Sequence, residues 1–276
     1  DARQRIGMLL NVMNAMAMTA LVFMGVTAYV MTATRAFSAP RGLMVGLFLS
    51  IIGAVALNGF LNIGILGMLI APLPHGERTI ELDFSGFAVV GIDMSVASPC
   101  IERVSNDHFQ SALLAVQKCR ELGYRRIGLV ISRQLSDRLE SRWLAGSRLA
   151  EDVIPKRDRV KMLMPEKTSD IVGTLPGWYA KEKPDVIIMS ELNPRGHYRI
   201  PARVGMVSLS LEEPIGFLTG IFQDNRRMGA IAIEHLVARL ERCEFGPDDR
   251  GRLHLLAGQW VAGKTAPGPG LLPRQL

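Results

Sequence analysis

Histidines, cysteines and paired acids are the residues of this sequence that could carry chemistry. The histidines are His75, His108, His197, His235 and His254, and the cysteines are Cys100, Cys119 and Cys243. No CxxC motif and no Cys/His metal-ligand spacing occurs among them, so we expect reduced thiols and neither a zinc site nor a disulfide framework. The acid pairs Glu212–Glu213 and Asp248–Asp249 stand near proline or glycine, so we expect them to be solvated loop charges.

Motifs of enzymes are missing from the sequence. There is no G-x-S-x-G nucleophile elbow, no P-loop, no H-E-x-x-H and no G-x-G-x-x-G after an expected strand. We therefore predict a protein that is not an enzyme, with no catalytic residues, no metal and no cofactor.

The charge balance allows a nucleic-acid partner but shows no surface for one. The 276 residues carry a formal net charge of +6, and a basic balance can indicate nucleic acid or an acidic membrane surface. The arginines are scattered, and neither a basic helix nor a zinc finger is visible. If the protein acts on DNA, the part that touches DNA is expected outside this chain.

The N-terminal quarter is almost free of charge. Between Ile6 and Pro72 the only charged residues are Arg35 and Arg41, and two uncharged runs each exceed the ~20 apolar residues that span a bilayer. Three interpretations stay open: a two-helix membrane hairpin, helices covered by another subunit, or an error in this stretch of sequence.

The hydrophobic pattern predicts strands that alternate with helices. Short apolar runs predict strands over 6–10, 67–72, 87–92, 101–105, 127–131, 185–189, 204–208, 253–256 and 259–261. Helical spacing predicts helices over 16–31, 43–58, 107–122, 142–152 and 228–240. This alternation favours an α/β fold with parallel sheets and helices on both faces.

Several segments, taken in order, resemble the sensor domain of LacI/GalR-type transcription regulators. They are Val104–Asp107, Glu121–Val130, Trp143–Gly146, Val204–Ser208, Gly220–Asn225 and Gly258–Val261, with Arg5–Leu10 as a match to the first sensor strand. The resemblance is strong over about 87–265 and weak over about 11–65, and it is the order and spacing of all the segments that make it specific.

The resemblance implies a type I periplasmic-binding-protein-like fold, in which two Rossmann-like lobes are joined by three crossovers. One lobe would comprise 1–105 and 224–255, the other 106–223 and 256–276. The helix-turn-helix headpiece that normally precedes this unit is absent from the chain.

The implied function is effector sensing and dimerisation in a cytoplasmic repressor. A small sugar-like effector would bind between the lobes. The further partners that the resemblance implies are a second copy of the chain and operator DNA, the latter through the headpiece missing from this chain. Two alternatives remain: a membrane-anchored sensor-like protein with an N-terminal hairpin, and a transport-type periplasmic solute-binding protein.

Nine effector-binding residues follow from the resemblance, position by position. They are Asn11, Asp93, Arg142, Trp143, Ser190, Glu191, Ser210, Gln223 and Asn225. Three hallmark positions depart from the family pattern: Trp143 stands where the family has arginine, Ser190–Glu191 replaces Asn-Asp, and Ser210 replaces an acid. Arginine and paired Asn/Asp groups normally bind sugar hydroxyls, so these changes argue against a simple sugar effector.

Overall fold

The computed structural model describes residues 66–74, 76–190, 198–214, 216–248 and 250–271. The expected strand over 6–10, the expected helices over 16–31 and 43–58, and the candidate residues Asn11 and Glu191 lie outside the described residues. So does most of the stretch for which a membrane hairpin was one interpretation. No helix in the described part has both the length and the apolar character needed to cross a bilayer.

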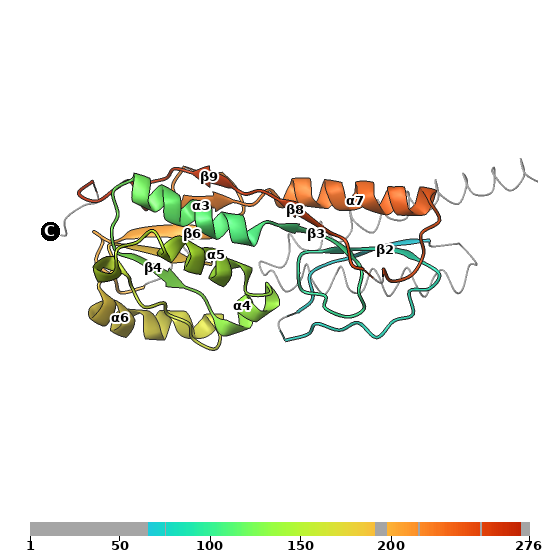
Figure 1. Cartoon of the computed structure of the whole chain (residues 1–276), viewed down its shortest axis with the longest axis horizontal. Coiled ribbons are helices and arrows are strands. Elements are labelled where there is room, and N and C mark those ends of the chain that lie inside the picture. Colours follow the sequence, from blue (N-terminus) through green and yellow to red (C-terminus); the bar gives the residue numbers. More distant parts are fainter. Residues whose placement is uncertain (1–65, 75, 191–197, 215, 249, 272–276) are drawn as a thin grey trace, which may run out of the picture.

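Two sheets lie end to end along the long axis of the molecule (Figure 1). The first is parallel, in the order β1-β2-β3-β8. Its strands are β1 (Gly67–Ile70), β2 (Ala88–Ile92), β3 (Glu102–Asn106) and β8 (Leu253–Leu256). The second has the order β4-β5-β6-β7-β9. Its strands are β4 (Ile127–Val130), β5 (Val186–Met189), β6 (Gly205–Leu211), β7 (Thr219–Phe222) and β9 (Gln259–Val261).

The chain crosses between the sheets three times, and the last crossing explains the one antiparallel pair. It leaves β3 for α3 (His108–Glu121), leaves β7 for α7 (Asn225–Glu241), and runs from β8 into β9. Because β8 is parallel to β3 and the chain continues onward into the second sheet, β9 enters that sheet against the direction of β7. An antiparallel edge strand on an otherwise parallel sheet is common in such folds.

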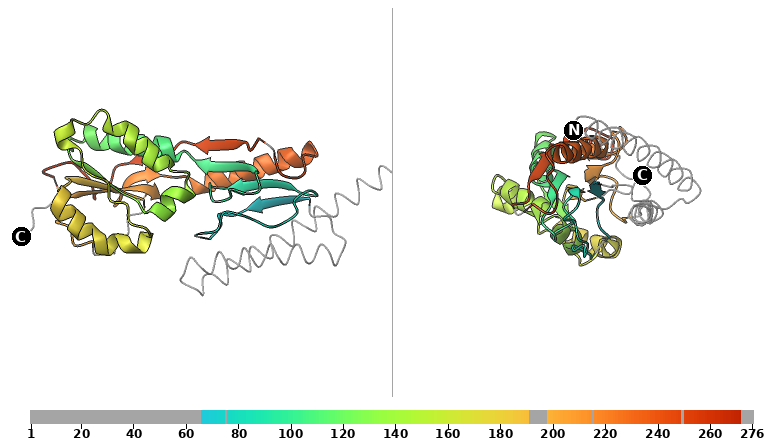
Figure 2. Two further views of the ribbon diagram at one scale, coloured as in Figure 1. Left: turned by 60° about the horizontal axis from the view of Figure 1, so that its bottom comes forward. Right: turned by 90° about the vertical axis from the view of Figure 1, so that its right-hand side faces the viewer.

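Helices cover both faces of the second sheet. They are α3 together with α4 (Arg133–Arg138), α5 (Arg142–Glu151) and α6 (Ile171–Glu182). Alternate residues of one strand point to opposite faces: Ile188 packs in the cluster of α3 and α5, and Ile187 in the cluster of α6. Figure 2 shows α6 on the far side of the sheet from α3 and α5.

The first sheet follows the same rule. Val90 and Val104 pack against Met228 and Ala232 of α7, whereas Val89 packs on the other face. Strand β2 is a continuous apolar run, as buried parallel strands usually are. Strand β3 instead carries polar residues at most of its positions, and β8 is only partly buried.

The predicted α/β class, with two sheets of mainly parallel strands joined by three crossovers, is confirmed. The residue boundaries of the two lobes stay a prediction. Helices α4 and α6 and strand β7 were not predicted from the sequence. Helix α6 contains Gly173, Pro176 and Gly177, which argue against a helix by propensity; burial of Ile171 and Leu175 on the sheet outweighs that preference.

Candidate functional site

The carboxyl ends of both sets of parallel strands meet at the junction between the sheets. Strand β3 leads directly from the first sheet into the second half of the molecule, and β7 leads directly back. Polar residues follow these strands: Asp107 caps α3 by accepting from the Gln110 backbone, and Asp224 caps α7 in the same way. Ligands of open α/β sheets bind at the carboxyl ends of strands, so this junction is the candidate site.

Asp93, directly after β2, is the centre of a charged cluster at the junction. Its Oδ1 atom lies 3.4 Å from Ser105 Oγ and 3.4 Å from His108 Nε2, and its Oδ2 atom lies 3.8 Å from Arg138 Nη2. Desolvation by itself would raise the pKa of Asp93. The hydrogen bond with His108, the interaction with the charge of His108 and the nearby Arg138 guanidinium together hold the pKa below its usual value. Asp93 is therefore a partly buried anion held by groups from both halves of the molecule.

Three further arginine contacts cross the junction directly. Arg138 of α4 donates to the Leu73 carbonyl at 2.8 Å, and Arg78 donates to the Asp137 carbonyl at 2.6 Å. Arg103 of β3 pairs with Glu140 at 3.1 Å. Helix α4 and the turn after it are thus tied to the loops of the first sheet by polar contacts, which a ligand in this place would have to use or displace.

Backbone strain gathers at the same junction. Asp93, Glu140 and Ser141 have φ values of 68°, 51° and 56°, in the left-handed region that costs a residue with a side chain free energy. Strained backbone of this kind clusters at ligand-binding sites, where the surrounding structure holds it in place despite its cost in stability.

Several buried polar atoms of the junction have no hydrogen-bond partner. They include Arg78 Nε, His108 Nδ1, Arg142 Nε and Trp143 Nε1. A buried polar group without a partner is rare and costs free energy. The arginine and tryptophan nitrogens among them are donors that a polar ligand at the junction could use.

A network of amides lies where the crossovers pass each other. Asn106 Nδ2 donates to Gln223 Oε1 and to Asn225 Oδ1, each at 3.2 Å. Gln223 Nε2 donates to the Leu209 carbonyl at 2.8 Å. The third crossover is joined to the first, because the Asp107 backbone N–H donates to the Leu256 carbonyl at 2.7 Å. The network therefore connects the three crossovers with one another.

The structure separates the described candidate residues into groups. Asp93 lies in the charged cluster, and Arg142 pairs with Glu140 at 3.5 Å. Trp143 is 3% exposed in the core and meets His108 edge to face, with ring centroids 4.9 Å apart. Gln223 and Asn225, expected to contact effector, share Asn106 in the amide network.

The two serines lie at the carboxyl ends of neighbouring strands. Ser190 is buried directly after β5. Ser210 lies near the end of β6, where its backbone N–H donates to Ser208 Oγ at 3.1 Å. Their positions agree with the predicted edge of the sheet, and whether they bind a ligand stays a prediction.

His108, Arg138 and Asn106 belong to the junction but were missed by sequence reasoning. His108 follows the helix cap Asp107 at once, so its place at a strand end was a usable signal. Arg138 had no such signal, because its partner Asp93 lies far away in the chain and follows a strand of the other sheet.

A shallow depression lies elsewhere, near Asp185 and Val204 at the amino ends of β5 and β6. Ligands of such sheets bind at the carboxyl ends of the strands, so this depression is not the candidate site.

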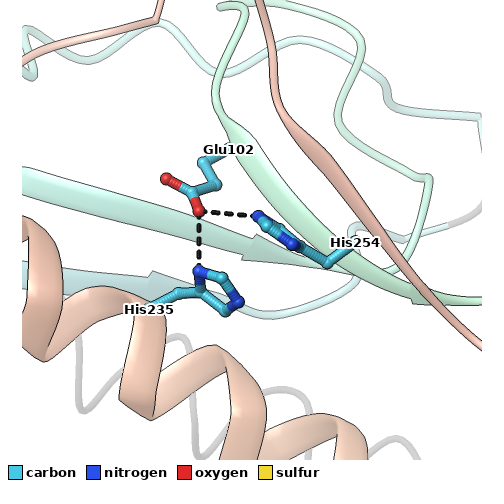
Figure 3. Close-up of side chains that lie close together, drawn as sticks. All are labelled: Glu102, His235 and His254. Atoms are coloured by element: carbon cyan, nitrogen blue, oxygen red, sulfur yellow. Dashed lines mark hydrogen bonds and ion pairs between the residues drawn. The ribbon is translucent and has the colours of Figure 1, made fainter.

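A second polar cluster lies on the first sheet (Figure 3). Glu102, His235 and His254 present one potential ligand atom each, and these atoms lie within 4.8 Å of one another. They come from β3, α7 and β8, so no spacing in the sequence could have indicated that they meet. Among the described residues, this is the group that could jointly hold a metal ion.

Comparisons with known proteins support the fold. No protein-family model and no curated protein sequence matches the chain. Solved structures do match, among them a periplasmic binding protein/LacI transcriptional regulator from Alkaliphilus metalliredigens complexed with D-xylulofuranose. Its TM-score is 0.56 at 14% identity, covering 77% of this chain and 81% of that chain.

Two further similar structures carry the same fold. A LacI family transcriptional regulator from Enterococcus faecium with bound ribose has a TM-score of 0.51 at 18% identity, covering 67% of this chain and 71% of that chain. The dimeric Lac repressor with an 11-residue C-terminal deletion has a TM-score of 0.50 at 19% identity, covering 66% and 70%. The chain therefore has the periplasmic-binding-protein-like fold of the effector-binding domains of LacI regulators, as the sequence resemblance predicted. These three structures are those of LacI-type regulators and of a periplasmic binding protein.

Proposed function

We propose that this chain is the effector-binding domain of a LacI-type DNA-binding transcription regulator, and that it takes a small polar effector at the junction of its two sheets. The observation that carries the proposal is the charged and partly unsatisfied cluster around Asp93 and Arg138, at the strand ends where this fold binds ligands. One lobe is proposed to comprise 1–105 and 224–255, the other 106–223 and 256–276.

The contacts across the junction give the effector something to act on. A ligand that binds Asp93 or Arg138 would replace the ion pair between them. It would therefore change the relative free energies of the possible arrangements of the two halves. The amide network of Asn106, Gln223 and Asn225 would be the region about which they turn. Couplings of ~1–3 kcal/mol suffice to regulate attached DNA-reading heads.

The similar regulators were solved with ribose and D-xylulofuranose, so sugars are the first class of effector to test. Sugar acids are the second, because Arg78, Arg103, Arg138 and Arg142 gather around the junction. Arginine pairs with a carboxylate through two parallel hydrogen bonds.

A thermal-shift screen of pentoses, disaccharides and sugar acids tests the proposal. A ligand at 100 times its dissociation constant stabilises by about 2.7 kcal/mol, which raises Tm by roughly 5–10 °C at the usual 2–4 °C per kcal/mol. The shift should vanish in Arg138→Met and persist in the matched control Arg148→Met, whose side chain is largely exposed on α5. No shift with any compound, or a full shift in Arg138→Met, would contradict the site.

DNA binding, the homodimer and the cytoplasmic location belong to the same proposal. DNA contact would come from a helix-turn-helix headpiece attached to this unit, and it is tested by an effector-dependent mobility shift with the natural full-length protein. Exposed Ile233 and Val237, one turn apart on α7, offer apolar surface to a second copy. Sedimentation without detergent should show a dimer, whereas recovery in the membrane fraction would favour the anchored alternative.

A further inference from the structure

The polar cluster of the first sheet has a buried carboxylate at its centre. The Glu102 side chain is 1% exposed, and its Oε1 atom lies 2.9 Å from His235 Nδ1 and 2.9 Å from His254 Nε2. The two imidazole rings lie almost against each other, with centroids 3.7 Å apart and an interplanar angle of 35°. Both rings therefore direct one nitrogen at the same oxygen (Figure 3).

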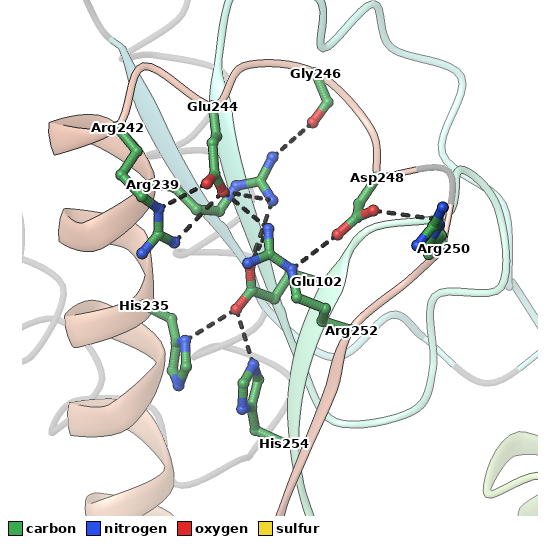
Figure 4. Close-up of polar contacts among 10 residues, drawn as sticks. All are labelled: Glu102, His235, Arg239, Arg242, Glu244, Gly246, Asp248, Arg250, Arg252 and His254. Carbon is green, nitrogen blue, oxygen red and sulfur yellow. Dashed lines mark hydrogen bonds and ion pairs between the residues drawn. The ribbon is translucent and has the colours of Figure 1, made fainter.

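The second oxygen of Glu102 is used by a different set of groups. Arg239 Nη1 lies 3.3 Å and Arg252 Nη2 3.4 Å from Oε2. Further carboxylates surround these guanidiniums: Glu244 lies 2.8 Å and Asp248 3.0 Å from Arg252 (Figure 4). The arginines thus hold the Oε2 atom of the carboxylate in place, and its Oε1 atom faces the histidines.

The charges of the ion-paired network balance. Its carboxylates are those of Glu102, Glu244 and Asp248, and its guanidiniums those of Arg239, Arg242 and Arg252. A dication at Oε1 would therefore meet a neutral network and not a net positive one.

We infer that Glu102, His235 and His254 form a binding site for a divalent transition metal, with zinc as the ion that best fits a carboxylate and two imidazoles. A tetrahedral zinc ion with bonds of about 2.0–2.2 Å spaces its ligands by about 3.4 Å. Glu102 Oε1 lies 2.9 Å from each imidazole nitrogen, so the two rings would have to move only slightly away from the carboxylate to admit the ion. Imidazole suits zinc, copper, nickel and iron, whereas magnesium and calcium prefer oxygen ligands.

The surroundings of the three ligands suit such a site. His235 and His254 are 28% and 35% exposed while Glu102 is buried, so an ion can enter from the solvent side and keep a water molecule as a further ligand. The arginine contacts to Oε2 hold the ligating carboxylate in orientation, as outer hydrogen bonds do in metal sites. Because the ligands come from β3, β8 and α7, the metal would fasten the helix to its sheet.

Titration calorimetry with zinc chloride alone, on protein treated with EDTA and then freed of the chelator, tests the inference. A single zinc per chain should bind, and zinc should raise Tm. His235→Ala and His254→Ala should each weaken binding by tenfold or more, because each removes one of three ligands. Glu241→Gln serves as the control: it removes an exposed acid of α7 that lies outside the ion-paired network, and it should leave the affinity within about twofold.

Two results would overturn the site. One is the absence of zinc binding to the folded protein. The other is binding that survives in both histidine variants but is lost in Cys100→Ser or Cys243→Ser, because these exposed thiols are the obvious competing ligands. Cobalt(II) gives an independent measure: its visible spectrum on the wild type should be that of a four-coordinate ion and should disappear in His254→Ala. Circular dichroism of each variant shows that a lost signal does not come from unfolding.

Discussion

Neutralising Glu102 tests how much the buried ion pair of the first sheet contributes to folding. The side chains of Glu102 and Arg239 are 1% and 3% exposed, with Arg239 Nη1 3.3 Å from Glu102 Oε2. Glu102→Gln keeps the shape of the side chain but leaves the guanidinium buried without its nearest counter-charge. Removing one partner of a buried pair costs about 3–5 kcal/mol.

The structure places this substitution near the lower end of that range. Arg239 keeps the Gly246 carbonyl as an acceptor at 3.1 Å, and Glu244 lies 3.9 Å away. Arg252 is 44% exposed, so losing its contact to Glu102 counts for little. We therefore expect a loss of about 3 kcal/mol, which corresponds to a fall in Tm of roughly 6–12 °C.

Urea unfolding at pH 7, with EDTA present so that no metal contributes, measures the change. The slope of free energy against urea should stay unchanged, since the surface exposed on unfolding is the same. Glu244→Gln serves as the matched control: it removes a partly exposed carboxylate from the same arginines and should destabilise far less.

Equal effects of Glu102→Gln and Glu244→Gln would refute the reasoning, because burial would then not decide the cost. The double variant Glu102→Gln/Arg239→Met gives a second check. It removes both charges, so it should recover much of the loss that Glu102→Gln causes alone. A double variant less stable than Glu102→Gln would show that Arg239 contributes to folding without its carboxylate.

Further predictions concern the junction and the helices that pack beside it. The pKa of Asp93 is lowered in the folded protein, so its stabilising effect is present above the unfolded pKa near 3.8 and is lost as pH falls through the folded value. Asp93→Asn should therefore cost about 1.5–3 kcal/mol at pH 7 and should flatten the acid limb of a curve of Tm against pH. An unchanged acid limb would contradict this. Gly146→Ala should cost about 1–3 kcal/mol in urea unfolding, since the new Cβ would lie only 2.3 Å from the Phe109 carbonyl oxygen where α5 crosses α3. Gly173→Ala in α6, where a Cβ meets nothing within 4 Å, should instead stabilise by about 0.4–1 kcal/mol, and equal costs at the two glycines would remove the steric argument.

Much of the fold could be predicted because its signals are local. Buried parallel strands such as Val186–Met189 are continuous apolar runs. Helix α3 shows helical spacing, and Gly123, whose φ is 95°, follows its C-cap Leu122 as a helix-ending glycine. Helix α6 could not be predicted, because its stability comes from packing against a sheet and not from its own residues.

The candidate site was predictable only at the level of strand ends. Asp93 follows an apolar run, so a place at the edge of the sheet was expected, and the structure puts it there. Trp143 could not be placed: the same residue suits ring stacking or the core, and only packing shows that 97% of it is covered. The order of segments that resembles LacI regulators was a local signal as well, and the fold comparison agrees with it.

The sequence by itself determined the alternation of strands and helices, the helix ends and the polar residues that follow the strands, because each depends on neighbours a few residues apart. Only the tertiary structure decided which of those residues meet. It brought Arg138 to Asp93 across two sheets, and it brought His235 and His254 to Glu102, although 133 and 152 residues separate the histidines from that carboxylate. Sheet order and chain crossing set these contacts, and no spacing along the chain records them.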